Sequence, residues 1–197
     1  MEIHTARLRL VPGTRRMLLA ELESPQALAT VLGIDVAPSW PPELYDYDAV
    51  RHMLAWLGDR PGHGAWGFYY VVERSASGTD SGPPWVVGAG GYKGAPDASG
   101  AVEIGCSITP ERRRCGYARE AVDGWLAHAF ADPRVTRVIA HTLVGLEPSI
   151  AVLRSAGFSF AGAGSDPQEP SAVQYVIPRE AYERSRASRH VARIVAD

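Results

Sequence analysis

The segment that most constrains the fold runs from residue 102 to residue 121, where one residue periodicity replaces another. Every second residue at its start is apolar, which predicts a strand with one buried face made of Val102, Ile104, Cys106 and Ile108. From residue 118 to residue 130, small or apolar residues recur at spacings of three and four, which predicts an amphipathic helix. A strand that leads directly into such a helix predicts a domain of mixed α and β structure.

The turn between this strand and this helix is basic and contains a glycine. The first amides of a helix have no acceptor inside the helix, and together with the helix dipole they attract phosphate oxygens. Gly116 allows a positive φ and a close approach of a ligand, while Ala118 adds little bulk. Arg112, Arg113 and Arg114 supply positive charge. The turn is therefore predicted to bind a phosphorylated ligand.

The rest of the chain alternates between strand and helix patterns around one predicted core. Strands are expected at residues 5–12, 66–73, 85–92, 101–108, 135–143 and 172–177, and helices at 14–32, 45–57, 118–130 and 148–156. The proline-rich segment 37–43 cannot form a regular helix. A polar linker, 74–84, is expected to be mobile and to join two antiparallel strands. The polar residues 184–197 are expected to fray.

Composition excludes several classes of protein. With 197 residues, of which 46% are hydrophobic, the chain can bury one sizeable core. Its 20 basic and 22 acidic side chains are mixed along the sequence, which argues against a nucleic-acid partner. No long apolar stretch and no leader pattern are present, so the expectation is a cytoplasmic protein without a membrane partner. Cys106 and Cys115 lack the companions that a zinc site requires, so no metal is expected.

The glycine-containing turn resembles the pyrophosphate loop of the GNAT (general N-acetyltransferase) superfamily. That loop reads Arg or Gln, two residues, Gly, one residue, then Gly or Ala, and Arg113-Arg-Cys-Gly-Tyr-Ala118 fits it. The preceding Val-Glu-Ile-Gly strand and the later Ser149-Ile-Ala-Val-Leu-Arg-Ser-Ala-Gly-Phe158 are also similar to family signatures. The chain looks most like the branch of ribosomal-protein-alanine N-terminal acetyltransferases.

This resemblance implies an α+β fold of the acyl-CoA N-acyltransferase type. Such a fold has a central twisted, mixed, mostly antiparallel sheet, helices on both faces, and a splay between the fourth and fifth strands. A single acetyltransferase domain is expected over residues 1–183, followed by a C-terminal tail over 184–197. Dimerisation is common in the superfamily, so a homodimer is a further expectation.

By the same resemblance, acetyl-CoA is the cosubstrate and lies between the strands at 102–108 and 135–143. Its pyrophosphate is expected on the amides of 113–118, and its thioester carbonyl at a β-bulge near 106–108. The residues expected to bind it are Cys106, Ser107, Ile108, Arg113, Arg114, Cys115, Gly116, Tyr117, Ala118 and Ser149.

The reaction implied is direct transfer of the acetyl group to a primary amine. Free alkyl amines are mostly protonated near neutral pH, so a general base is needed, and Glu103 is the candidate. The alternative is that Glu103 is solvated or ion-paired. Trp40 and Tyr92 are candidates to line the acceptor pocket, although aromatic residues are first of all core formers. His141 is expected on a strand surface outside the active site.

Two departures from the family pattern leave alternatives open. Leu146 stands where many relatives have Asn, and Leu153 stands where some have the tyrosine that protonates the leaving thiolate, so no general acid is assigned. A protein N-terminus and a small-molecule amine both remain candidate acceptors. The alternative function is a non-catalytic acyl-CoA sensor or regulatory module.

Overall fold

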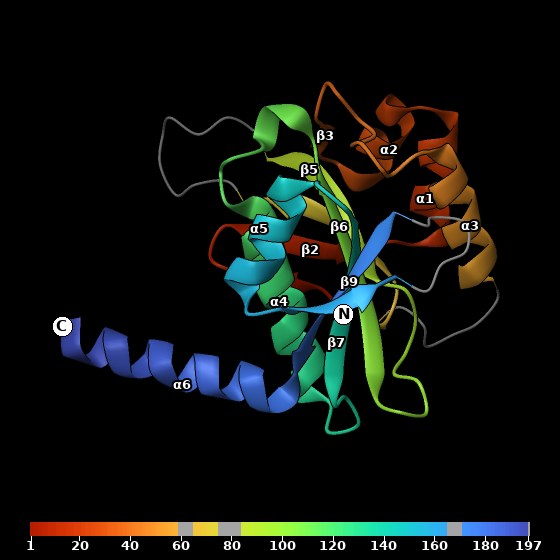
Figure 1. The fold of residues 1–197 in the computed structure, drawn as a ribbon. Coiled ribbons are helices and arrows are strands. Elements are labelled where there is room, and N and C mark those ends of the chain that lie inside the picture. Colours follow the sequence, from red (N-terminus) through yellow and green to blue (C-terminus); the bar gives the residue numbers. More distant parts are fainter. Residues whose placement is uncertain (59–64, 75–83, 165–170, 197) are drawn as a thin grey trace. The chain divides into compact units, whose positions relative to one another are not determined.

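The computed structural model describes residues 1–58, 65–74, 84–164 and 171–196, and the chain forms two compact units. The first unit comprises Met1–Ala95 and Gly105–Trp125, and the second comprises Pro96–Ile104 and Leu126–Asp197. One strand, β6, and one helix, α4, are each divided between the units, and Figure 1 labels them.

The helices and strands follow one another in a mixed order. The strands are β1 (Ile3–His4), β2 (Leu8–Pro12), β3 (Asp35–Val36), β4 (Phe68–Glu73), β5 (Trp85–Tyr92), β6 (Ala101–Ile108), β7 (Arg137–Leu143), β8 (Ser159–Ala163) and β9 (Ala172–Pro178). The helices are α1 (Arg15–Glu23), α2 (Pro25–Leu32), α3 (Tyr47–Leu57), α4 (Tyr117–Ala131), α5 (Glu147–Ala156) and α6 (Arg179–Ala196). A 3-10 turn, Pro110–Arg112, follows β6.

The sheet of the first unit is antiparallel around β4. Strand β2 pairs with β1 on one side and with β4 on the other, and β4 pairs with β5, in each case antiparallel. The short strand β3 pairs with β5 in parallel. The antiparallel pairing predicted for the segments at 66–73 and 85–92 is confirmed. The linker expected to be mobile between them falls mostly on residues 75–83, which lie outside the described residues.

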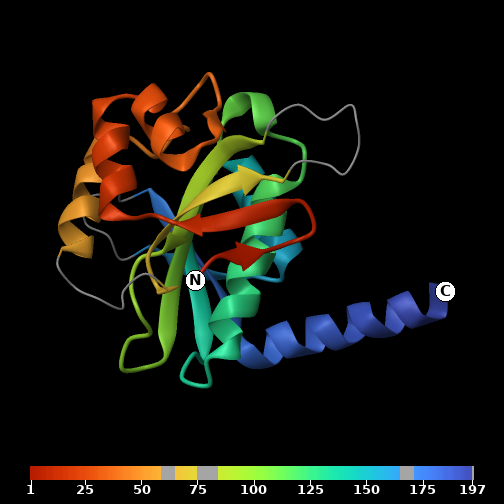
Figure 2. The same cartoon turned by 180° about the vertical axis from the view of Figure 1, so that it is seen from behind.

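Strand β4 is buried on both faces because different helices cover its two faces. Phe68, Tyr70 and Val72 point into a core that also contains Leu18 of α1 and Val50 of α3. Figures 1 and 2 show α1, α2 and α3 side by side. Alternate residues on the strand therefore pack against this helical cluster.

The opposite face of the same sheet meets the first half of α4. Tyr69 lies 6.4 Å from Trp125, ring centroid to ring centroid, and Tyr92 donates its hydroxyl hydrogen to the Trp125 carbonyl at 2.6 Å. A Cβ at Gly90 would come within 2.6 Å of the Trp125 ring, so the glycine makes room for the indole. The predicted amphipathic helix is confirmed, and its apolar repeat is buried from Ala121 to Phe130.

The single helix expected over residues 14–32 is wrong, because the chain breaks it at Ser24. Pro25 has no N–H to continue the α1 hydrogen-bond ladder, and it begins α2 instead. The Ser24 side chain accepts a hydrogen bond from the Ala27 N–H at 3.0 Å and so caps the new helix.

In the second unit, β7 lies between the first half of β6 and β9. Residues Ala101–Ile104 pair with Arg137–Ala140 in parallel, and β7 pairs with β9 antiparallel, as β9 does with β8. The register of this parallel pair runs from Ala101 and Arg137 to Ile104 and Ala140, and the splay expected between the fourth and fifth strands stays a prediction. Gly157 ends α5 with φ of 96°, as the sequence predicts.

The α+β fold class, with a mixed and mostly antiparallel sheet flanked by helices, is confirmed. Sequence patterns missed β1, β3, β8 and α6. Residues 184–196, expected to fray, continue α6, which crosses residue 183 without a break, so the division into a domain and a tail stays a prediction. Within the described ranges, no helix has the length and apolar character needed to span a bilayer.

Candidate functional site

The turn before α4 has the backbone geometry of an anion-binding loop. Gly116 has φ of 80°, and its carbonyl accepts the first hydrogen bond of the helix, from the Glu120 N–H at 3.0 Å. The N–H groups of Tyr117 and Ala118 precede this bond, so no helical carbonyl lies in position to accept from them. The helix dipole adds partial positive charge at the same end. The loop therefore offers main-chain donors at a helix N-terminus.

Arg114 stands in the same left-handed region, with φ of 62°, and its side chain is exposed. A non-glycine residue there costs about 1 kcal/mol or more. The strained backbone presents a guanidinium at the loop surface.

Arg113 is held in place by two contacts within the first unit. Its Nε donates to the Ile108 carbonyl at 3.0 Å, and its Nη2 lies 3.0 Å from Glu43 Oε2. Both side chains of this ion pair are substantially exposed, 41% for Arg113 and 71% for Glu43, so the pair is worth little free energy. A phosphate group can therefore replace Glu43 as the partner of Arg113.

Arg112 and Tyr117 both contact Glu73 at the end of β4. Tyr117 donates its hydroxyl hydrogen to Glu73 Oε1, and Arg112 Nη2 lies 3.8 Å from Glu73 Oε2. Burial, together with the Glu73 carboxylate, raises the pKa of Tyr117 to about 12, so its hydroxyl keeps its hydrogen at neutral pH. These contacts anchor the two ends of the loop to β4.

Arg7, just before β2, anchors the loop from the other side. Its Nη1 donates to the Cys115 carbonyl at 2.9 Å, and its Nε donates to Glu120 Oε2 at 2.7 Å. Glu120 Oε1 also accepts from the Thr5 hydroxyl at 2.6 Å. The φ of Gly116 favours glycine, and a Cβ added there would lie in a tight contact, 3.2 Å from Arg7 Nη2. Hydrogen bonds and an ion pair among Thr5, Arg7 and Glu120 thus hold the loop backbone in place.

The second half of β6 leads to this loop. Ile108 is buried, but Cys106 is exposed, so the buried face predicted for Cys106 is wrong. The regular alternation of buried residues ends after Ile104, and the β-bulge expected at 106–108 stays a prediction. Ser107 donates its hydroxyl hydrogen to the Glu43 carbonyl. The structure thus brings Ser107 and Arg113 to one segment, around Glu43.

Ser149 and Glu103 belong to the second unit, whereas the loop residues belong to the first. Ser149 is in the first turn of α5. The Glu103 carboxylate, on β6, lies 3.0 Å from His141 Nδ1, measured from Oε1. His141 Nε2 in turn lies 3.2 Å from Gln174 Nε2. About a fifth of the His141 and Glu103 side-chain surface is exposed, 20% and 23%, so solvent reaches the pair.

Trp40 and Tyr92, the candidates for the acceptor pocket, both lie in the core of the first unit. Tyr92 is 1% exposed and Trp40 is 7% exposed. Trp40 donates its indole N–H to the buried Glu21 at 2.8 Å, and Tyr45 and Tyr70 donate their hydroxyl hydrogens to the same carboxylate. The structure favours the core interpretation of both aromatic residues, which leaves neither of them exposed to an acceptor.

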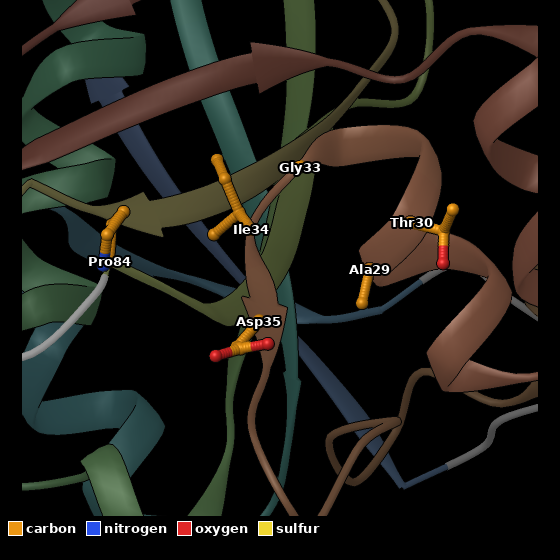
Figure 3. A pocket seen from close by; sticks show the side chains of 6 residues that line it. All are labelled: Ala29, Thr30, Gly33, Ile34, Asp35 and Pro84. Carbon is orange, nitrogen blue, oxygen red and sulfur yellow. The ribbon is translucent and has the colours of Figure 1, made fainter.

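A pocket of about 270 Å³ lies near α2 and β3, and no predicted site residue lines it (Figure 3). Its lining consists of Ala29, Thr30, Gly33, Ile34, Asp35 and Pro84. Within the residues that the structure describes, no three His, Cys, Asp or Glu side chains cluster as metal ligands would.

The chain matches the model of a known family over most of its length. Residues 16–159 match the family model described as Acetyltransferase (GNAT) domain, which covers both the loop and Glu103. The chain belongs to the GNAT acetyltransferase family.

Solved structures of this family share the fold. The GNAT acetyltransferase from Bacillus anthracis is 19% identical, with a TM-score of 0.59, and the match covers 91% of this chain and 99% of that one. RimL, a ribosomal L7/L12 alpha-N-protein acetyltransferase solved with coenzyme A, is 16% identical, with a TM-score of 0.60, covering 92% of this chain and 99% of that one. An acetyltransferase from Agrobacterium tumefaciens is 19% identical, with a TM-score of 0.57, covering 90% and 94%. No curated protein matches the GNAT chain in sequence.

Sequence reasoning missed the partners of the predicted site residues. Each of these contacts joins residues that are far apart in the sequence. Arg7 contacts both Cys115 and Glu120, and Glu43 contacts Arg113. The sequence pattern places His141 on a plain strand surface and does not single out Gln174, yet both belong to the cluster around Glu103. The signal available was the alternation of β7, which places His141 on the same face as Ile139, the register partner of Glu103.

Proposed function

We propose that this GNAT protein transfers the acetyl group of acetyl-CoA directly to a primary amine. Membership of the family supports acetyl transfer. The main support for acetyl-CoA as the cosubstrate is the loop itself. Gly116, with φ of 80°, lies just before the N-terminus of α4, and three consecutive arginines precede it closely in the chain. Main-chain donors and guanidinium groups together suit a diphosphate.

The main-chain donors and the arginines of the loop support the binding of the cosubstrate diphosphate there. Tyr117 and Ala118 would donate main-chain hydrogen bonds, and Arg113 and Arg114 would contribute charge. The position at Gly116 tolerates no side chain without a contact to Arg7. When bound, acetyl-CoA supplies an acyl group activated as a thioester.

Glu103 is proposed as the general base. A protonated amine cannot attack a carbonyl, so a carboxylate that accepts its proton, directly or through water, allows the reaction. The Glu103 side chain is partly exposed and hydrogen-bonded, which suits a group that must exchange protons with an incoming amine. Direct transfer needs no acyl-enzyme, so no cysteine nucleophile is proposed. The Cys115 thiol of the loop instead donates to the Arg113 carbonyl at 3.5 Å.

The acceptor is proposed to be a protein N-terminus or a small-molecule amine. RimL, which shares the fold, is a ribosomal L7/L12 alpha-N-protein acetyltransferase, and this likeness favours the first class. The formal net charge of −2 is too small to select between a basic and an acidic client.

Two measurements test the proposal together. Calorimetric titration with acetyl-CoA, ATP and NAD should show saturable binding of acetyl-CoA alone. Thiol release should then be measured with a serine-initiated peptide, an alanine-initiated peptide, spermidine and lysine. Binding without turnover of any acceptor would favour the sensor alternative, and no binding at all would remove the cosubstrate assignment.

A further inference from the structure

Three polar side chains on neighbouring strands of the second unit form a continuous hydrogen-bonded row. In the β6–β7 register, Glu103 faces Ile139, so His141, two residues further along, lies on the same face. In the β7–β9 register, His141 faces Gln174 directly. The backbone pairing therefore places Glu103, His141 and Gln174 side by side on one face of the sheet, and the distances of 3.0 Å and 3.2 Å agree.

The two contacts of His141 specify one state of its ring. An ionised carboxylate only accepts hydrogen bonds, so the ring nitrogen beside Glu103, Nδ1, must carry a hydrogen. The Gln174 amide nitrogen only donates, so the opposite ring nitrogen, Nε2, must accept. The row is satisfied with a neutral imidazole that donates from Nδ1 and accepts at Nε2.

The two faces of these strands differ in burial. Val138, Ala140 and Ile177 are fully or almost fully buried, whereas the side chains of Glu103 and His141 are partly exposed. A row of polar groups at a partly exposed position costs less to desolvate than one in the core. It can therefore orient a reactive carboxylate that solvent and substrate can reach.

We propose that His141 is a positioning residue for Glu103, and that Gln174 fixes the ring tautomer in which His141 can do this. The inference rests on the proposed function, because it assigns a role to His141 through the general base. The Nδ1–H of His141 holds the Glu103 carboxylate in one orientation as a proton acceptor. Loss of this hydrogen bond removes a contact that orients the carboxylate and weakens general-base catalysis.

Substitutions at His141 separate positioning from packing. His141→Asn keeps an amide donor close to the place of Nδ1, whereas His141→Leu keeps the bulk and removes the donor. We expect kcat to fall roughly 10- to 100-fold in H141L, with KM for acetyl-CoA unchanged, and to recover to within a few-fold of wild type in H141N. His128→Leu, on α4, removes a histidine outside the row and should leave kcat unchanged.

Nitrogen-15 NMR of labelled histidine reads the ring state without any turnover. We expect His141 in the wild-type protein as the single tautomer with hydrogen on Nδ1, and a mixture of tautomers in Gln174→Leu. A wild-type ring with hydrogen on Nε2 would overturn the proposal, as would equal losses of kcat in H141N and H141L with matching thermal unfolding midpoints.

The outcomes also separate this proposal from the proposed function. Wild-type turnover that H141L leaves unaltered would defeat the role of His141 and leave acetyl transfer intact. Absence of turnover by wild type on every acceptor, with the Nδ1 tautomer observed, would defeat the proposed reaction and leave the hydrogen-bonded row established as structure only.

Discussion

The backbone conformation of Gly116 shapes the loop that is proposed to bind acetyl-CoA. Its φ of 80° favours glycine, and a Cβ there would lie 3.2 Å from Arg7 Nη2. Gly33 has a similar φ of 65°, but a Cβ added there would meet no atom within 4 Å, so substitution at Gly33 measures the backbone strain alone.

Gly116→Ala is therefore expected to weaken acetyl-CoA binding on the order of tenfold, which is about 1.4 kcal/mol. Both Gly116→Ala and Gly33→Ala should lower the free energy of unfolding by about 1 kcal/mol. Calorimetric titration and urea denaturation measure the two effects. Equal affinity for acetyl-CoA in both variants would contradict the binding role of the loop.

Glu21 shows how a buried charge shapes stability. The carboxylate is fully buried, and burial raises its pKa although Tyr70, Trp40 and Tyr45 donate hydrogen bonds to it. A raised pKa in the folded state means that the folded protein binds the proton more tightly than the unfolded chain. The contribution to stability is then complete below the ordinary value of 4.5 and is lost as pH rises through the folded pKa.

Glu21→Gln should remove this pH dependence while keeping hydrogen bonds to the aromatic residues. The free energy of unfolding of wild type relative to this variant is expected to decrease as pH rises above 4.5, the ordinary pKa of a glutamate, as measured by urea denaturation. Glu21→Leu leaves three buried donors without their acceptor and should cost on the order of 3 kcal/mol near pH 4, with a smaller cost as pH rises because the wild type loses the contribution of the protonated carboxyl group. A flat difference between wild type and Glu21→Gln would contradict the assignment.

At the scale of elements, the segment between α2 and α3 holds the loop residues in their present contacts. The Glu43 carboxylate contacts Arg113, the Glu43 carbonyl accepts from Ser107, and the Ser39 N–H donates to Glu111 at 3.1 Å. Because the Glu43–Arg113 pair is exposed, a diphosphate needs to overcome only a small free energy to take its place.

Glu43→Gln is expected to raise the affinity for acetyl-CoA about two- to fivefold at low salt, since Arg113 no longer has a competing anion. The gain should disappear near 1 M salt, where exposed charges are screened. Glu23→Gln, at an exposed position of α1, changes the net charge equally and should leave the affinity unaltered. Calorimetric titration of both variants at two salt concentrations makes the comparison.

The first turn of α4 is joined to the start of β2 through Glu120. Burial acts to raise the pKa of this carboxylate, but hydrogen bonds from Thr5, the Arg7 N–H and the Arg7 guanidinium outweigh it, so the pKa is lowered overall. A lowered folded pKa contributes stability that is present above the unfolded value and is lost as pH falls.

Glu120→Gln should therefore destabilise the protein by about 2 kcal/mol at neutral pH and by less as the pH is lowered below 4.5, the ordinary value of a glutamate. Urea denaturation near pH 7 and near pH 4 compares the two proteins. A destabilisation that grows toward low pH would contradict this account of the contact.

At the scale of the whole molecule, the second unit ties the end of β9 to the end of α4. The Arg179 guanidinium donates to the carbonyls of Phe130, Asp132 and Val135 at 2.6 to 2.8 Å. Tyr182 stacks on Phe130 with ring centroids 4.6 Å apart. These contacts lie before residue 184, where the predicted tail begins.

Ending the chain after Glu183 should leave the thermal unfolding midpoint and acetyl transfer close to those of the full chain. Tyr182→Ala should instead cost about 3 kcal/mol, because it removes a buried aromatic ring. Thermal unfolding of the two proteins tests this pair. A large loss of stability on truncation would show that residues after 183 belong to the domain.

The sequence by itself determined the elements whose causes are local. The alternation at the start of β6, the periodicity of α4, the glycine that ends α5 and the loop at Gly116 all follow from neighbouring residues. The family motif was readable for the same reason, since a phosphate loop is built from consecutive amides. Local patterns also misled, because Pro25 divided one expected helix and Cys106 proved exposed.

Only the tertiary structure decided which distant side chains meet. The pairing of Arg113 with Glu43, the support of the loop by Arg7 and Glu120, and the burial of Trp40 against Glu21 depend on how helices pack on the first sheet. The row of Glu103, His141 and Gln174 depends on strand register, which brings together residues that no local periodicity relates. Contacts across strands and between packed elements depend on long-range pairing of the chain. A single sequence contains both residues of each contact, but it does not show which residues meet.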